Sequence, residues 1–297
     1  MAAFGLGKKF GLTCAVAAAL FCVLGSGVAE TPEDVDVALV IATDVSYSID
    51  ENEAHFQRQG AVSAFRNPDV IKAIQSGPRG RIAVAYIDFA TVGANKVIAG
   101  WHIIRDESSA NEFAARLEAA PRTLGVNTSI SSGIELAMHL LETSGIRAEK
   151  RMIDISGDGP NNEGHMVDRV RDEAVAKGII INGLPIMTPA DQFDIYYLPD
   201  IDKYYAGCVI GGQGSFIQVA HGFEDLERAL RRKLILEISD AAPSRPLLMK
   251  VAAAAPAPSH PAYDKGCDIG ERMRFGQLRN SEREANLEFQ PLEFQPR

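Results

Sequence analysis

The chain has 297 residues, of which 46% are hydrophobic and 23% charged; its formal net charge is −9 and its isoelectric point is about 5.2. This composition is typical of a soluble globular protein, and the length suffices for one large domain or two small ones. The acidic balance argues against a nucleic-acid partner, because phosphate binding normally requires a basic surface.

The first 29 residues have the features of a secretory signal peptide. Lys8 and Lys9 supply a basic start, and residues 11–25 form an apolar stretch that is shorter than the roughly 20 residues of a membrane span. Residues 27–29 place small side chains at a cleavage position. We therefore expect a periplasmic or secreted bacterial protein without a membrane span after cleavage, and an uncleaved N-terminal anchor is the alternative.

Beyond residue 34, short apolar runs alternate with stretches of helical periodicity. The predicted strands are residues 37–42, 81–89, 96–101, 152–156, 179–185 and 214–220. The predicted helices are a segment capped by Asp50 and residues 107–119, 130–143, 165–177 and 223–239. Such alternation indicates an α/β fold with a doubly wound, mostly parallel sheet and helices on both faces. The close succession of the second and third strands predicts one antiparallel edge strand.

The domain is predicted to span residues 34–240, with residues 188–212 as a long surface loop. Residues 241–297 have the composition of an Ala/Pro linker followed by a polar, disordered tail, which contains a tandem LEFQP sequence at 287–296. Cys208 and Cys267 are the cysteines outside the signal peptide. An oxidising compartment permits them to form a disulfide, but the sequence leaves this pairing open.

Oxygen-bearing side chains follow three predicted elements at one edge of the sheet. Asp44, Ser46 and Ser48 come after the first strand, Thr128 precedes a helix, and Asp158 follows a later strand. In parallel α/β sheets, ligands bind at the carboxyl ends of the strands. Two carboxylates and three hydroxyls, without histidine or cysteine, form a hard-oxygen set that suits Mg²⁺. Mn²⁺ or Ca²⁺ are alternatives, whereas zinc normally recruits nitrogen or sulfur ligands.

The DxSxS sequence at residues 44–48, followed in order by Thr128 and Asp158, resembles the von Willebrand factor A (vWA) domain family. This likeness covers residues 35–240 and implies a Rossmann-like fold with a metal-ion-dependent adhesion site (MIDAS). Within the family, this sequence is most similar to bacterial secreted proteins without an assigned role.

The resemblance also implies a role for each site residue. Ser46 and Ser48 resemble the direct hydroxyl ligands, and Thr128 resembles the threonine that ligates in the ligand-bound form. Asp44 and Asp158 resemble the carboxylates that hold the metal directly or through water. In the family, a glutamate or aspartate of a partner protein completes the coordination, so the implied partner is a protein that presents such a residue.

One loop departs from the family pattern. Residues 156–159 read Ser-Gly-Asp-Gly, where the family commonly has an apolar residue followed by Thr-Asp-Gly. Asp158 remains the best match, and a contribution from Asn161 or Asn162 is the alternative. We interpret Asp88 and Asp154, which lie in or next to predicted strands, as structural carboxylates with satisfied interactions; a supporting role behind the metal ligands is the alternative.

These observations predict a non-enzymatic, metal-dependent binding module. The alternative is a Mg²⁺-dependent phosphatase of the haloacid dehalogenase type, because GDGPNN after an apolar strand resembles that family's fourth motif. Those enzymes use a second aspartate as general acid and base, and Ser46 occupies its position. A serine hydrolase that uses Ser46 or Ser48 lacks the GxSxG elbow and an assignable base.

Overall fold

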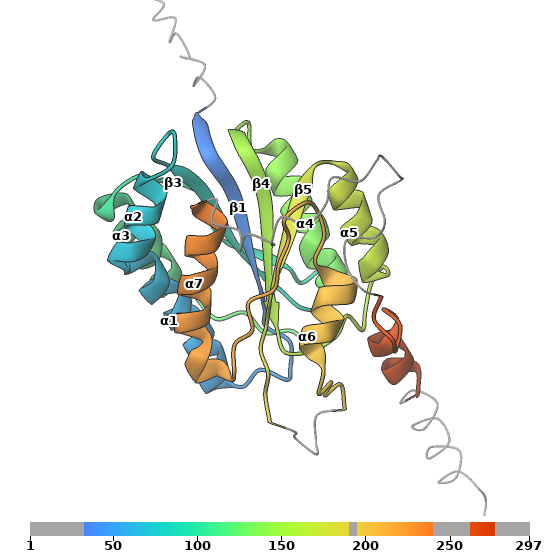
Figure 1. Ribbon diagram of the computed structural model, residues 1–297. Helices are drawn as coiled ribbons and strands as arrows, with labels where there is room; N and C mark the ends of the chain where they lie inside the picture. Colours follow the sequence, from blue (N-terminus) through green and yellow to red (C-terminus); the bar gives the residue numbers. More distant parts are fainter. Residues whose placement is uncertain (1–32, 190–194, 240–261, 277–297) are drawn as a thin grey trace, which may run out of the picture. The chain divides into compact units, whose positions relative to one another are not determined.

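The computed structural model describes residues 33–189, 195–239 and 262–276. Five strands form one sheet in the order β3-β2-β1-β4-β5 (Figure 1). They are β1 (Asp34–Asp44), β2 (Ile82–Phe89), β3 (Lys96–Ile104), β4 (Arg147–Gly157) and β5 (Ile179–Pro185). Strands β2, β1, β4 and β5 are parallel, and β3 is antiparallel to β2 at the edge. The predicted fold class, including the antiparallel edge strand, is confirmed.

Helices cover both faces of this sheet (Figure 1). They are α1 (Glu51–Arg66), α2 (Pro68–Gln75), α3 (Glu107–Ala119), α4 (Ile130–Thr143), α5 (Val167–Ala176), α6 (Ile201–Tyr204) and α7 (Leu226–Ile238). One apolar core joins the sheet to α1, α2, α3 and α7, and a second joins it to α4, α5 and α6. Strand β1 is buried along almost its whole length, which explains its continuous apolar sequence.

The start of α1 follows the sequence prediction. The side chain of Asp50 accepts from the N–H of Glu53 at 2.9 Å, and Glu53 accepts from the N–H of Asp50 at 2.9 Å, which is the reciprocal capping arrangement. Phe56, which falls on the apolar face of the helical pattern in the sequence, is 42% exposed. Helix α2 was missed by the sequence prediction, although Asn67 as cap and Pro68 at the first position are typical start signals.

Two expectations near the end of the domain are wrong. Part of the predicted surface loop 188–212 is buried, because α6 and a π-helical turn, Tyr205–Val209, pack their tyrosines into the second core. Residues 190–194 of that loop lie outside the described residues. The predicted strand 214–220 runs beside β5 through isolated bridges only. There the N–H of Phe216 donates to the side chain of Asn182, which interrupts a regular ladder.

Cys208 and Cys267 form a disulfide that joins the π-helical turn to residues 262–276. Residues 269–276 of that segment are helical. The signal peptide predicted at 1–29 and the remainder of 241–297 fall outside the described residues. Within the described ranges, no helix has the length and apolar character needed to cross a membrane.

A buried charge network links α7 to the sheet. Lys233 is fully buried; its Nζ lies 2.6 Å from Oδ1 of Asp154 on β4 and also contacts Glu237. The side-chain amide of Asn182 on β5 donates to Oε1 of Glu237 at 2.8 Å. Asp154 is therefore a paired structural carboxylate, as predicted. Two carboxylates share one ammonium group here, so one negative charge is in excess when all three groups are ionised.

This excess charge predicts a pH-dependent stability. Burial raises the pKa of Glu237 to about 7; Lys233 opposes this increase and Asp154 adds to it. Because the folded-state pKa exceeds the ordinary value of 4.5, the stabilisation is complete below pH 4.5 and is lost as the pH rises through 7. Urea unfolding at pH 5 and pH 8 should show a loss of about 2–3 kcal/mol in the free energy of unfolding from this group. Between these two pH values, the Glu237→Gln variant should lose clearly less stability than the wild type. The Glu227→Gln variant, at an exposed position of α7, should lose as much stability as the wild type. Equal pH profiles for wild type and Glu237→Gln would contradict this account.

Candidate metal site

The predicted ligand residues lie on loops that meet at the carboxyl end of β1. This strand pairs with β2 on one side and β4 on the other, so its end is the point where the direction of winding reverses. The N–H of Gly125 donates to the carbonyl of Val45 at 3.0 Å, and the N–H of Asn162 donates to the carbonyl of Thr128 at 2.9 Å. The first bond joins the loop before α4 to the loop after β1. The second bond joins the loop before α4 to the loop after β4.

Hydrogen bonds connect four of the five predicted residues. The N–H of Ser46 donates to Oδ1 of Asp44 at 2.8 Å and thereby tightens the turn after β1. The hydroxyl oxygens of Ser46 and Ser48 are 3.2 Å apart, and the hydroxyl of Ser48 donates to Oδ1 of Asp158 at 3.1 Å. The DxSxS spacing thus brings three side chains to one point, next to the carboxylate that β4 delivers.

Asp44 is fully buried, and its Oδ2 has no hydrogen-bond partner in the described part of the chain. Burial raises the pKa of Asp44 well above its ordinary value, and the charge of Asp158 adds to this increase. A buried carboxylate oxygen without a partner is costly. A cation at this position would offset that cost, so the residues present fit a divalent metal.

Gly157, at the end of β4, is required by close packing around Asp44. A Cβ at this position would lie 2.9 Å from Oδ2 of Asp44 and 2.9 Å from the hydroxyl of Tyr205. Within the described ranges, that hydroxyl also has no hydrogen-bond partner. Burial, and then the charge of Asp44, raise the pKa of Tyr205, so the phenol stays protonated near neutral pH. The glycine that departs from the family pattern therefore makes room for a tyrosine hydroxyl beside Asp44.

Thr128 is positioned by the asparagines that follow Asp158. Its N–H donates to Oδ1 of Asn162 at 2.9 Å, and Oδ1 of Asn161 accepts from the N–H of Ser131 at 2.9 Å. Both amide oxygens are thus engaged with the backbone at the start of α4. Thr128 is 4% exposed, and its Oγ1 lies 3.8 Å from the Cβ position of Gly159, so the hydroxyl faces the loop that carries Asp158.

The sequence prediction missed the positioning roles of Gly157, Tyr205 and Asn162. The adjacent asparagines were a visible signal, but which backbone groups they bind depends on how the loops meet. In the ranges that the structure covers, no cluster of three or more His, Cys, Asp or Glu side chains could hold a metal. The candidate site therefore depends on its hydroxyl oxygens.

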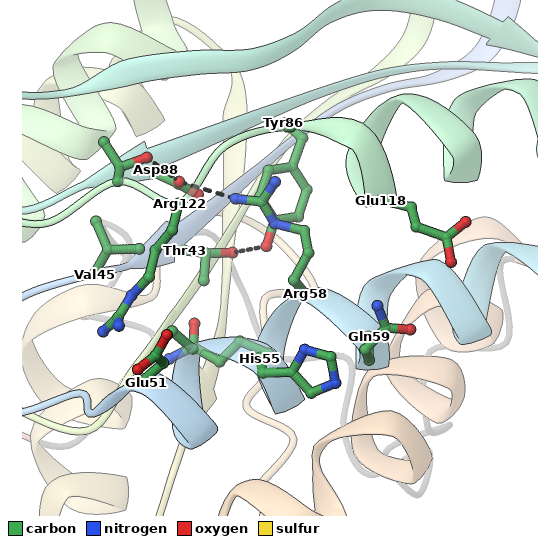
Figure 2. A pocket seen from close by; sticks show the side chains of 14 residues that line it. Thr43, Val45, Glu51, His55, Arg58, Gln59, Tyr86, Asp88, Glu118 and Arg122 are labelled. Atoms are coloured by element: carbon green, nitrogen blue, oxygen red, sulfur yellow. Dashed lines mark hydrogen bonds and ion pairs between the residues drawn. The ribbon is translucent and has the colours of Figure 1, made fainter.

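A separate polar pocket of about 250 Å³ lies between α1 and the sheet (Figure 2). Thr43 and Val45 line it, whereas the alternate residues Asp44 and Ser46 do not. Figure 2 shows the guanidinium of Arg58 reaching Asp88, with which it forms an ion pair at 3.0 Å. Asp88 is therefore a paired carboxylate, as predicted, and this pocket contains none of the candidate metal ligands.

The sheet order, the antiparallel edge strand and the loops that meet beyond β1 define an α/β fold of the vWA type. The pilus adhesin SpaC from Lactobacillus rhamnosus GG has this fold at a TM-score of 0.50 and 15% identity, over 69% of this chain and 31% of that chain. Proximal thread matrix protein 1 from the mussel byssus matches with a TM-score of 0.48 and 16% identity, over 70% of this chain and 47% of that chain. A von Willebrand factor type A protein from Catenulispora acidiphila matches with a TM-score of 0.47 and 12% identity, over 69% of this chain and 43% of that chain.

This chain thus spans less than half of each of these proteins. At 15% identity, the match to SpaC establishes a likeness of fold alone. The chain belongs to the family described as protein of unknown function (DUF1194), which matches residues 34–242. Among curated proteins, none matches the sequence.

Proposed function

We propose that this domain is a metal-dependent protein-binding module of the adhesion type, with Mg²⁺ held by Asp44, Ser46, Ser48, Thr128 and Asp158. The observation that carries the proposal is the unpartnered Oδ2 of the buried Asp44, next to two serine hydroxyls and a second carboxylate. Hard oxygen donors of this kind favour Mg²⁺, and Mn²⁺ or Ca²⁺ are the alternatives.

The charges around the site indicate what kind of partner it takes. Mg²⁺ is six-coordinate and usually keeps several waters, so one more anionic oxygen can replace a water in its coordination shell. The partner is therefore a protein that presents a glutamate or aspartate side chain. In this arrangement Asn162 holds the backbone N–H of Thr128, and the hydroxyl of Thr128 faces the loop that carries Asp158, next to the position of the cation. We further propose that the protein acts in the periplasm or outside the cell, in line with the signal peptide predicted at residues 1–29.

Affinity capture from a periplasmic extract tests this proposal. Wild-type protein in Mg²⁺ is expected to retain specific partners, which EDTA releases. The Asp44→Ala variant should retain none of them under either condition. Partners that stay bound in EDTA and to Asp44→Ala would contradict a metal-dependent mechanism. Turnover of a generic aryl phosphate that requires Mg²⁺ and Asp44 would instead support the phosphatase alternative.

A further inference from the structure

Four exposed apolar side chains lie on or beside the loops that carry the candidate ligands. Tyr47 is 85% exposed and stands between the two serines of the DxSxS turn; Leu124 is 69% and Val126 71% exposed on the loop before α4. Val92 is 50% exposed, and its backbone N–H donates to Glu163 on the loop after β4. We call these four residues the apolar rim. Isolated exposed apolar residues are ordinary, but a group around a polar centre marks an interaction surface.

Three residues of the apolar rim line a pocket on one side of the site. A pocket of about 500 Å³ is lined by Tyr47, Ile49, Leu124 and Val126, with Arg122 at its wall. The guanidinium of Arg122 donates to the carbonyl of Ile49 at 3.1 Å, so this wall is fixed. The surface thus offers a place for an apolar side chain next to a place for a carboxylate.

Residues 262–276 contact the loop that carries Asp158. The disulfide of Cys267 fixes one end of the segment. Glu271 accepts from the amide of Asn161 at 2.7 Å, and Arg274 donates to the carbonyl of Asn162 at 3.3 Å. Asn162 in turn holds Thr128. Gly276, the last described residue, thus follows closely after Arg274, which contacts the loop that carries Asp158.

The sequence beyond residue 276 contains a segment with the matching chemistry. The tandem repeat reads Leu287-Glu288-Phe289-Gln290-Pro291 and then repeats as residues 292–296. Each copy places one carboxylate between two large apolar side chains. Each glutamine precedes a proline and is thereby biased toward an extended backbone, which lowers the entropy lost on binding.

We propose that the LEFQP repeat is an intramolecular ligand of the metal site. Glu288 or Glu293 supplies the carboxylate to the cation, and the flanking leucine and phenylalanine contact the apolar rim. The inference rests on the proposed function, because it requires a bound cation. Glu288 is 12 residues beyond Gly276, and an extended chain of this length reaches about 40 Å. Tethering raises the effective concentration of the segment to about the millimolar range, so the repeat competes with external partners for the cation.

Hydrogen–deuterium exchange of the full chain, followed by mass spectrometry, tests the inference. In Mg²⁺, the amides of residues 287–296 should exchange at least about tenfold more slowly than in EDTA. The double variant Glu288→Gln/Glu293→Gln should lose this protection. The matched variant Glu282→Gln/Glu284→Gln removes the same charge from the same tail and should keep it. Tyr47→Ser/Leu124→Ser should weaken the protection several-fold. Because tail docking and cation binding are linked, it should lower the Mg²⁺ affinity of the full chain, measured by calorimetry, by no more than Glu288→Gln/Glu293→Gln does.

The outcomes separate this inference from the proposed function. Wild-type protein that binds Mg²⁺ but shows equal tail exchange with and without the metal would overturn the inference alone. A chain that binds no Mg²⁺ would overturn both. Protection that increases with protein concentration would assign the repeat to a second copy and would contradict the intramolecular arrangement.

Discussion

Replacing Asp44 with asparagine is expected to abolish the response of the protein to Mg²⁺. In the wild type, Mg²⁺ at one hundred times its dissociation constant should raise the free energy of unfolding by about 2.7 kcal/mol. The variant should show no increase, because it lacks the buried carboxylate whose Oδ2 is without a partner. Isothermal titration calorimetry should show at least a hundredfold weaker affinity, and thermal unfolding in Mg²⁺ and EDTA provides the second readout.

The same variant separates metal binding from folding. In EDTA, Asp44→Asn should be at least as stable as the wild type, because it removes a negative charge that burial and the neighbouring charge of Asp158 both disfavour. Asp50→Asn is the matched control, since it makes the same charge change at an exposed helix cap where asparagine serves equally well. A variant that is much less stable in EDTA, or that still binds Mg²⁺ normally, would contradict this assignment.

Of the substitutions considered, Lys233→Met should produce the largest decrease in the free energy of unfolding. The substitution leaves Asp154 and Glu237 buried without the ammonium group that now pairs with both. Removing one partner of a buried ion pair costs about 3–5 kcal/mol. Urea unfolding at neutral pH measures this loss, and secondary structure followed by circular dichroism shows whether the fold is retained.

Two further variants identify charge as the cause. Arg232→Met, at the exposed neighbouring position on α7, should change stability by less than about 0.5 kcal/mol. Replacing Lys233, Asp154 and Glu237 together with apolar residues of similar size should recover most of the loss, since no uncompensated charge remains. If Lys233→Met loses less than 1 kcal/mol, the network does not hold α7 to the sheet.

The sequence was sufficient to predict the five strands of the sheet, because each parallel strand contains a mostly apolar stretch that is buried. The antiparallel edge strand followed from the short connection between β2 and β3. The region after β5 was harder to predict, because its polar residues and tyrosines lack periodicity. There a disulfide and the buried Tyr204 and Tyr205 determine the structure, and both depend on contacts with residues far along the chain.

Placement of the candidate ligands at one edge was also predictable, since parallel strands bring the loops after them to the same side. The supporting residues were not. Asn162 binds backbone groups of Thr128 on another loop, and Gly157 is required by the approach of Tyr205. Such contacts follow from the way loops meet in space, which no local pattern records.

The central claim is that a divalent cation occupies the oxygen cluster at the end of β1. Anomalous diffraction from a crystal of the full chain grown in Mn²⁺ tests it most directly. The account predicts a strong peak within about 2.5 Å of the hydroxyl oxygens of Ser46 and Ser48, and none there in Asp44→Asn crystals. A wild-type crystal without a peak at this edge, or with manganese bound only elsewhere, would contradict it.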